Sequence, residues 1–209
     1  MTILLATTSA HKAREIADLL ADSDLTLQTL NDYPATEAPE EDGETMADNA
    51  RIKAQFYSQH FGCTVLADDS GLEVDALNGE PGVHSARWAE GSDADRVRAL
   101  LDRLQDVEED ARTARYRCAL CLATPDEILL ETEGTCEGAI APLAEGFEGF
   151  GYDPIFRITL ATGTESELVG QTLGQVPSQV KATVSHRARA VLELAEKMES
   201  LGTGQLSQE

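Results

Sequence analysis

The first thirty residues alternate between short apolar runs and a stretch with helical periodicity. The run from Thr2 to Thr8 ends in hydroxyls and is typical of a buried strand. Ser9 can cap a helix in which apolar residues such as Ala13 and Leu20 recur at helical spacing. A second apolar run, Leu25 to Leu30, predicts another strand. A strand, a helix and a strand in this order indicate an α/β protein.

Further elements of both kinds follow along the chain. Thr45 and Asp48 form the pattern of a capping box at the start of a second helix, and Ser92 can cap a third. The segments 113–124 and 128–140 predict two long neighbouring strands that form an antiparallel hairpin. A final helix near the C-terminus is expected to bury the side chains of Ala188, Val191, Leu192, Ala195 and Met198.

The length and the charge of the chain restrict the classes of protein to consider. A chain of 209 residues supports one sizeable core, so we expect a single domain over residues 1–200 and a polar tail over 201–209. The net charge of -22 argues against a nonspecific nucleic-acid partner. No run reaches the roughly 20 apolar residues of a membrane helix, and the N-terminus lacks a signal-peptide pattern. We therefore expect a cytoplasmic protein, and we interpret its acidity as a sign of a high-salt cytoplasm.

The four cysteines do not predict a disulfide framework, and we expect them to be reduced. Cys118 and Cys121 form a C-x-x-C pattern within a predicted strand. Positions three apart on a strand face opposite sides, whereas a redox or zinc pair needs a helix start or a second pair of cysteines. A structural role for both cysteines is therefore favoured.

Four polar clusters interrupt the apolar pattern where a strand or loop meets a helix or turn. Ligands of open α/β sheets collect outside the carboxyl ends of the strands, so we expect these clusters to converge. The first cluster also offers backbone N–H groups and a helix dipole, which favour phosphate. The clusters are residues 7–12, Glu40 and Glu41 with Asn49 and Lys53, residues 68–71, and residues 185–187.

Asp68 and Asp69 are expected at the C-terminal end of a short strand, residues 64–67. Together with Glu40 and Glu41 they make an oxygen-rich set, which suits Mg²⁺ because this ion accepts carboxylates while keeping waters and substrate phosphates. Two adjacent acids alone are more often part of a turn or a helix cap. Lysine is a compact charge that suits phosphate oxygens. Three of the only four lysines lie in or beside the clusters: Lys12, Lys53 and Lys181.

Several longer motifs occur in a fixed order along nearly the whole chain. They are Thr7 to Lys12, Glu41 to Gly43, Asn49-Ala50 with Lys53-Ala54, Ala67 to Leu72, Gly79 to Val83 with Ser85 to Arg87, Phe150 to Phe156, and Lys181 with Ser185 to Arg187. Together they resemble the inosine triphosphate pyrophosphatase family, the XTP/dITP diphosphatases.

The resemblance implies a fold and an activity. The fold would be α/β, with a long central mixed β-sheet flanked by helices and two lobes with a cleft between them, usually as a homodimer. The activity would be the Mg²⁺-dependent hydrolysis of non-canonical purine nucleoside triphosphates (ITP, dITP and XTP) to the monophosphate and pyrophosphate. Such an enzyme removes deaminated purines from the nucleotide pool.

The resemblance also implies roles for single residues. Asp69 would be the general base that activates water, and it would hold Mg²⁺ together with Glu41, with Asp68 in support. The triphosphate would be held by Thr7, Thr8, Ser9, Lys12, Lys53 and Ser70. The base pocket would be formed by Phe150, Gly151, Tyr152, Asp153, Lys181, His186 and Arg187. In such a pocket an aromatic ring stacks on the purine, and donors aimed at a 6-keto oxygen reject adenine.

Two residues leave room for other interpretations. Ser9 stands where the family pattern has Asn, which puts a phosphate contact there in doubt, and His186 could simply cap the last helix. Alternative functions are a related pyrophosphatase for pyrimidine or modified nucleotides, a nucleotide-binding regulator without turnover, and an acidic interaction protein. The motifs at 150–156 and 185–187 argue against the first alternative, and the intact Asp68-Asp69 pair argues for an enzyme.

Overall fold

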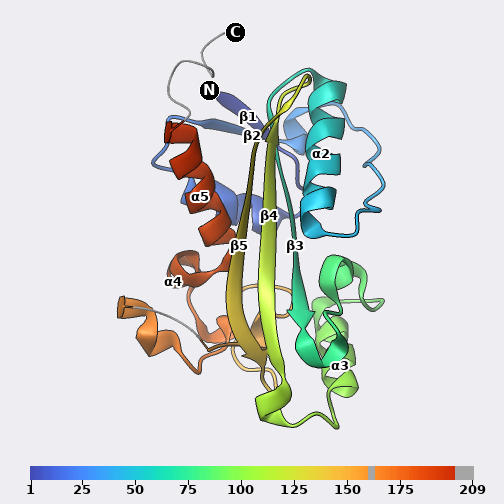
Figure 1. Cartoon of the computed structure of the whole chain (residues 1–209), viewed down its shortest axis with the longest axis vertical. Coiled ribbons are helices and arrows are strands. Elements are labelled where there is room, and N and C mark those ends of the chain that lie inside the picture. Colours follow the sequence, from blue (N-terminus) through green and yellow to red (C-terminus); the bar gives the residue numbers. More distant parts are fainter. Residues whose placement is uncertain (160–162, 201–209) are drawn as a thin grey trace. The chain divides into compact units, whose positions relative to one another are not determined.

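The computed structural model describes residues 1–159 and 163–200, in which helices and strands alternate as far as β4 (Figure 1). The strands are β1 (Thr2–Leu5), β2 (Thr26–Thr29), β3 (Val65–Val74), β4 (Thr113–Ala123), β5 (Ile128–Ile140) and β6 (Phe156–Ile158). The helices are α1 (Ala10–Leu19), α2 (Met46–Phe61), α3 (Asp93–Arg103), α4 (Ser178–Val184) and α5 (His186–Ser200).

The strands form one mixed sheet in the order β2-β1-β3-β4-β5-β6. β1 pairs in parallel with β2 and with β3, whereas β5 and β6 are antiparallel. β4 and β5 form the predicted antiparallel hairpin, because backbone hydrogen bonds join its two ends: Thr124 N–H to the Glu127 carbonyl and Ile140 N–H to the Arg112 carbonyl. The predicted α/β fold with a mixed sheet flanked by helices is therefore confirmed.

The chain divides into two compact units. Unit 1 comprises Met1–Asp69, Cys118–Gly134 and the segment that begins at Arg187, and unit 2 comprises Ser70–Arg117 and Thr135–His186. A single functional domain over residues 1–200 stays a prediction. The predicted tail, 201–209, lies outside the described residues.

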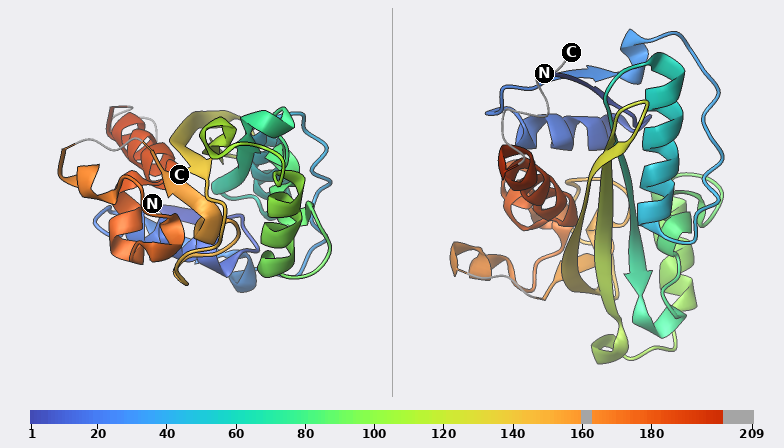
Figure 2. Two further views of the ribbon diagram at one scale, coloured as in Figure 1. Left: turned by 90° about the horizontal axis from the view of Figure 1, so that it is seen from below. Right: turned by 45° about the horizontal axis from the view of Figure 1, so that its top comes forward.

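In unit 1, helices cover both faces of the strands. Ile16 of α1 and Val191 of α5 pack with Leu66 of β3 in one apolar cluster. α2 lies on the other side of the strands and buries Ala54 and Tyr57 (Figure 2). β1 and the unit 1 part of β3 are therefore buried on both faces, as expected for a parallel arrangement.

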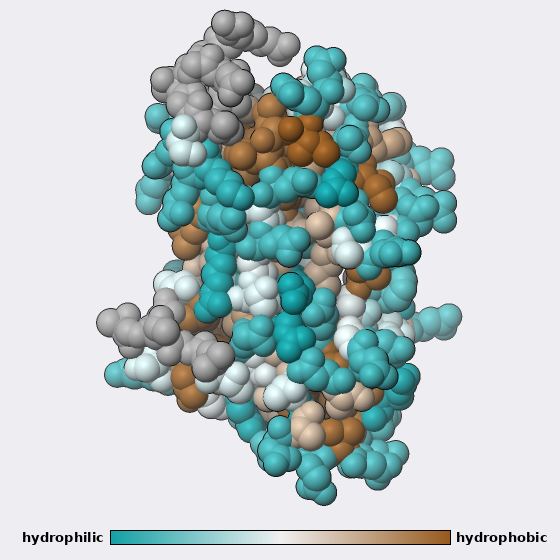
Figure 3. Space-filling model, in the orientation of Figure 1, coloured by the Kyte–Doolittle hydropathy of each residue, from teal (hydrophilic) through white to brown (hydrophobic). Residues whose placement is uncertain are grey.

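The core of unit 2 is built around α3 and the parts of β3, β4 and β5 that belong to this unit. Val97 and Leu100 of α3 join Leu72 of β3 and Phe156 of β6 in a second apolar cluster. Hydrophilic residues predominate on the face of the molecule shown in Figure 3, in keeping with the net charge of -22. Among the helices that the structure describes, none is both long and apolar enough to span a membrane.

The helix caps predicted from the sequence are present in the structure. The Ser9 side chain accepts a hydrogen bond from Lys12 N–H, and both Thr45 with Asp48 and Ser92 with Asp95 form complete capping boxes. α4 was not predicted, since its residues lack an extended apolar stripe. The prediction for α5 is right for Val191 but wrong for Leu192, whose side chain is 52% exposed.

Candidate active site

The first polar cluster of unit 1 lies between the end of β1 and the start of α1. The Thr7 hydroxyl accepts a hydrogen bond from Ser9 N–H at 3.2 Å, and the Ser9 hydroxyl accepts one from Lys12 N–H at 3.4 Å. Thr8 is exposed beside them. The cluster therefore combines a capped helix start with hydroxyls and an ammonium group, a suitable setting for phosphate.

β3 is longer than the short strand predicted over residues 64–67. It extends through Asp68 and Asp69 to Val74, so the two acids lie inside the strand and not at its C-terminal end. Because β1 pairs with β3 only as far as Leu66, both acids lie just beyond the end of β1. This is the position at which ligands gather in parallel sheets.

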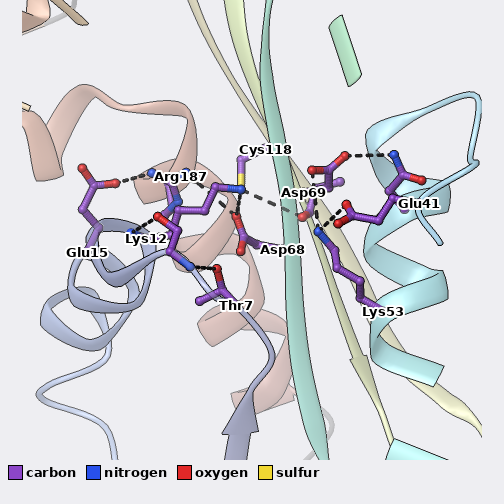
Figure 4. Close-up of polar contacts among 12 residues, drawn as sticks. Thr7, Lys12, Glu15, Glu41, Lys53, Asp68, Asp69, Cys118 and Arg187 are labelled. Carbon is purple, nitrogen blue, oxygen red and sulfur yellow. Dashed lines mark hydrogen bonds and ion pairs between the residues drawn. The ribbon is translucent and has the colours of Figure 1, made fainter. Parts of the chain in front are cut away.

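Asp68 and Asp69 point in opposite directions, since successive side chains of a strand alternate between the two faces. Figure 4 shows Asp68 turned towards Lys12 and Arg187, and Asp69 turned towards Glu41 and Lys53. The distance from the Lys12 ammonium to Asp68 Oδ2 is 2.9 Å. The two acids therefore belong to different groups of charges.

The group around Asp69 contains a second carboxylate, an ammonium and an amide. Lys53 Nζ lies 2.9 Å from Glu41 Oε2 and 3.7 Å from Asp69 Oδ1. Asn49 donates a hydrogen bond to Asp69 Oδ2 at 3.2 Å and accepts one from Gly43 N–H at 2.8 Å. Any Cβ at Gly43 would lie 2.6 Å from the Asn49 side-chain oxygen, so this approach requires glycine. Asn49 thus connects the loop before α2 to Asp69.

The group around Asp68 includes an arginine that is almost fully buried. Arg187, at the start of α5, is 1% exposed, and its guanidinium forms ion pairs with Glu15 of α1 and, at 3.9 Å, with Asp68. The resemblance implied a place in the base pocket for Arg187. Its ion pairs place it beside Lys12 in unit 1, and its role in the base pocket stays a prediction.

The surroundings shift the pKa values of the two acids in opposite directions. Burial raises the pKa of Asp69 above its usual value, and the charges of Lys53 and Lys12 offset this only in part. Burial would also raise the pKa of Asp68, but the charges of Lys12, Arg187 and Lys53 outweigh it and lower that pKa. At neutral pH, Asp68 is therefore a firmly ionised counter-charge, and Asp69 is a carboxylate with increased proton affinity.

In unit 2, Asp153 organises the glycine-rich loop that contains Phe150. Asp153 Oδ2 accepts hydrogen bonds at 2.8 Å from Phe150 N–H and from the Lys181 ammonium. The Lys181 Nζ atom lies 4.8 Å from the centroid of the Phe150 ring, within the range of a cation–π contact. Gly149 adopts a φ of +76°, and any Cβ there would lie 2.0 Å from Asp153 Oδ2. The loop thus presents an aromatic ring beside a buried ammonium.

Aromatic packing and a tyrosine hydrogen bond complete this part of unit 2. His186 stacks on Tyr116, with ring centroids 4.7 Å apart and planes 10° apart. Tyr152 donates a hydrogen bond to the Ser85 carbonyl at 3.0 Å, and burial raises the pKa of Tyr152 to about 12. Unit 2 therefore contains five of the residues predicted for the base pocket, Phe150, Tyr152, Asp153, Lys181 and His186, and brings Phe150, Asp153 and Lys181 into mutual contact. Of the other predicted residues in unit 2, Gly151 is part of the same loop and Ser70 is half-buried on β3.

Comparison with known proteins identifies the family. The model of the Ham1 family matches residues 3–197. The chain belongs to the Ham1 family. It is 41% identical over 204 residues to a dITP/XTP pyrophosphatase of Geobacillus kaustophilus, covering 97% of this chain and 96% of the relative. A dITP/XTP pyrophosphatase of Listeria monocytogenes is 42% identical over 194 residues, with 92% of each chain covered.

Solved structures of Ham1 proteins have the same fold. The Ham1 protein of Staphylococcus aureus matches with a TM-score of 0.82 at 33% identity, over 96% of this chain and 100% of that one. A nucleoside-triphosphatase and dITP/XTP pyrophosphatase of Mycobacterium abscessus matches with a TM-score of 0.72 at 40% identity, over 93% and 98%. The family predicted from the motifs is therefore confirmed, and the names of these relatives agree with the predicted activity.

The chemistry of the Ham1 site is compatible with a magnesium ion. Within residues 1–159 and 163–200, no group of three or more His, Cys, Asp or Glu side chains is arranged as a set of metal ligands. Mg²⁺ nevertheless needs only one or two carboxylates when water and substrate phosphates complete its coordination. Glu41 and Asp69, which both contact Lys53, make such a pair. Asp68 faces the other way and does not extend this pair.

Sequence reasoning assigned no role to several residues of the Ham1 site. Asn49 was included in a polar cluster but was given no function. The signal available in the sequence was its motif with Lys53, which follows one helical turn later. Glu15 and Tyr116 were missed because an acid on α1 and an aromatic residue in an apolar strand look ordinary. Their roles depend on partners that are distant in the sequence.

Proposed function

We propose that the chain hydrolyses non-canonical purine nucleoside triphosphates, namely ITP, dITP and XTP, to the monophosphate and pyrophosphate. Such an activity removes deaminated purines from the nucleotide pool. The observation that carries the proposal is the buried Asp69 carboxylate, whose pKa is raised and which lies with Glu41 around Lys53. The names of the Ham1 relatives support the same substrates.

Glu41 and Asp69 are the residues that would hold Mg²⁺. The bound ion would neutralise charge on the triphosphate and polarise the phosphorus that is attacked. Lys53 lies between the two carboxylates and supplies a positive charge of its own, so it is suited to a phosphate oxygen as well.

Asp69 is the proposed general base. Its raised pKa increases its affinity for the proton that the attacking water must lose. The hydrogen bond from Asn49 fixes one carboxylate oxygen and leaves the other for the water. Asn49 is thus a positioning residue in this proposal.

The phosphates would be held by the start of α1 and by the cations around Asp68. Thr7, Thr8 and Ser9 offer hydroxyls and backbone N–H groups, and Lys12 offers an ammonium. We assign Asp68 to this group and not to the metal, because its described ion pairs are with Lys12 and Arg187. Ser70, the next residue on β3, stays a predicted phosphate contact.

The loop of unit 2 would recognise the purine base. Phe150 supplies a ring for stacking, and Lys181, held by Asp153, supplies hydrogen-bond donors for a 6-keto oxygen. The amino group of adenine cannot accept such hydrogen bonds, which leaves buried donors unsatisfied and disfavours ATP. Gly151 and Tyr152 fix the same loop, and His186, stacked on Tyr116, and Arg187 stay predicted residues of the base pocket.

A substrate panel tests the proposal. Pyrophosphate release is measured from ITP, XTP, GTP, ATP and dTTP with Mg²⁺ and with EDTA. We expect rapid release from ITP and XTP, slow release from ATP and dTTP, and none in EDTA. Binding of ITP without release would favour the regulator, and a preference for dTTP would favour a pyrimidine-specific relative.

Three properties of the protein in the cell also stay predictions. A homodimer would appear at about twice the chain mass of 22.5 kDa in sedimentation equilibrium. The cytoplasmic location and the adaptation to high salt rest on composition alone.

A further inference from the structure

The loop that contains Phe150 is fixed at three successive residues of unit 2. Phe150 N–H donates to Asp153 at 2.8 Å, and Tyr152 donates its hydroxyl hydrogen to the Ser85 carbonyl at 3.0 Å. Between them, Gly151 N–H donates to Asp93 Oδ2 at 2.7 Å. Asp93 is 58 residues away in the sequence, at the first position of α3.

Asp93 is not needed to cap α3. The Ser92 hydroxyl accepts from Asp95 N–H at 3.3 Å, and Asp95 Oδ2 accepts from Ser92 N–H at 2.9 Å, which completes the capping box without Asp93. The Oδ1 atom of Asp93 pairs with Arg96, which also donates to the Gly91 carbonyl at 3.0 Å. Arg96 thereby fixes the Asp93 carboxylate, while its Oδ2 atom accepts from the loop.

The hydrogen bond to Asp93 acts on the residue that sets the direction of the loop. Gly151 has a φ of +62°, in the left-handed region that glycine adopts readily. A Cβ built at Gly151 would find no heavy atom within 4 Å, so no neighbouring atom fills the side on which a side chain would project. The charge-assisted hydrogen bond to Asp93 at 2.7 Å fixes the direction of the Gly151 N–H group.

We propose that Asp93 is a positioning residue for base recognition, acting through Gly151 on the Phe150 ring. The inference rests on the proposed function, because Phe150 matters only if it contacts a base. Loss of the Asp93 hydrogen bond would let the loop leave its left-handed turn, so the ring would spend less time in the stacking position. Asp69 and the phosphate-binding cations lie in unit 1 and keep their own contacts.

The test compares Asp93→Ala with a control on the same helix. Asp95→Ala removes one carboxylate from the same turn of α3 and breaks its cap, but it does not break the hydrogen bond to Gly151. Asp93→Asn serves as a partial rescue, since an amide oxygen can still accept from Gly151. For each variant, kcat and KM are measured with ITP and Mg²⁺, and the amide exchange of Gly151 is measured by NMR without nucleotide.

Asp93→Ala is expected to raise KM by roughly tenfold, the effect of losing one hydrogen bond to a charged group, and to change kcat by less than about twofold. Gly151 amide exchange should become faster, and Asp93→Asn should fall between Asp93→Ala and the wild type. Asp95→Ala should lower thermal stability while keeping the wild-type KM.

A wild-type KM in Asp93→Ala, or equal KM changes in Asp93→Ala and Asp95→Ala, would overturn the inference. If the wild-type chain releases no pyrophosphate from any nucleotide, the proposed function fails. The exchange of the Gly151 amide still tests the contact with Asp93 in that case, so the two failures can be told apart.

Discussion

Replacing each acid of the Asp68-Asp69 pair with asparagine should have opposite energetic consequences. Asp68 is an ionised counter-charge for Lys12 and Arg187, and its pKa is lowered. A carboxyl with a lowered folded pKa stabilises the fold above its unfolded pKa, and this contribution is lost as the pH falls through the folded value. Asp68→Asn removes this stabilisation at neutral pH.

For Asp69 the sign is reversed. Burial raises its pKa, so its contribution to stability is complete below the unfolded pKa and is lost as the pH rises through the folded value. Above its folded pKa and without metal, the ionised Asp69 is therefore a cost to the fold. Asp69→Asn removes that cost, and the new amide oxygen can still accept the hydrogen bond from Asn49.

The magnitude for Asp68→Asn follows from what remains after the change. Lys12, whose side chain is 17% exposed, can turn towards water, but Arg187 is buried and loses one of its ion-pair partners. Removing one member of a buried ion pair costs about 3–5 kcal/mol. At about 2–4 °C per kcal/mol for a chain of this size, Tm should fall by roughly 6–20 °C. For Asp69→Asn the change should stay within about 1 kcal/mol.

Thermal unfolding at pH 7 in EDTA, followed by circular dichroism, measures both shifts. Repeating the scans at lower pH provides the internal check. The deficit of Asp68→Asn should shrink as the pH falls below about 4, because the Asp68 carboxyl of the unfolded chain gains its proton there and that of the folded protein gains it only at lower pH. Equal losses of Tm in the two variants, or a deficit that does not change with pH, would refute the assignment of Asp68 as the counter-charge.

Three further predictions concern catalysis, thiols and salt. Asp69→Asn should lower turnover of ITP by about 10² or more while ITP still binds, and a near-normal rate would place the general base elsewhere. Burial raises the pKa of Cys118 and of Cys121 to about 12, so a thiol reagent at pH 8 should label the half-buried Cys63 first and these two only after unfolding. The unfolding midpoint should rise steeply from low to molar potassium chloride, because salt screens the repulsion of a net charge of -22; a flat response would contradict the high-salt interpretation.

Features that depend on neighbouring residues were predictable from the sequence. The caps at Ser9, Thr45 and Ser92 involve hydrogen bonds between residues three apart, so the residue types alone indicate them. The C-x-x-C segment was also read correctly, since Cys118 and Cys121 are buried thiols within β4. The hydrogen bonds of the cluster from Thr7 to Lys12 likewise join residues two or three apart.

Features that depend on tertiary packing were not predictable. The face of α5 that packs inwards contains Val191 and Leu194, and which face packs is decided by the strands beneath it, so Leu192 was assigned wrongly. The contact between Asp93 and Gly151 joins residues 58 positions apart, and an acid in the first turn of a helix otherwise looks like a response to the helix dipole.

The extension of β3 to Val74 explains how one motif can supply the two chemical functions that we propose for Asp68 and Asp69. At the end of a strand, two adjacent acids could turn towards one ion, but within a strand they must face opposite sides. Asp68 can therefore neutralise the cations proposed to hold phosphate, while Asp69 keeps the desolvated environment that raises its pKa. Placing both acids on one face would put two carboxylates beside the same lysine and weaken the counter-charge on the other face. The alternation of the strand thus separates the counter-charge, Asp68, from the proposed general base, Asp69.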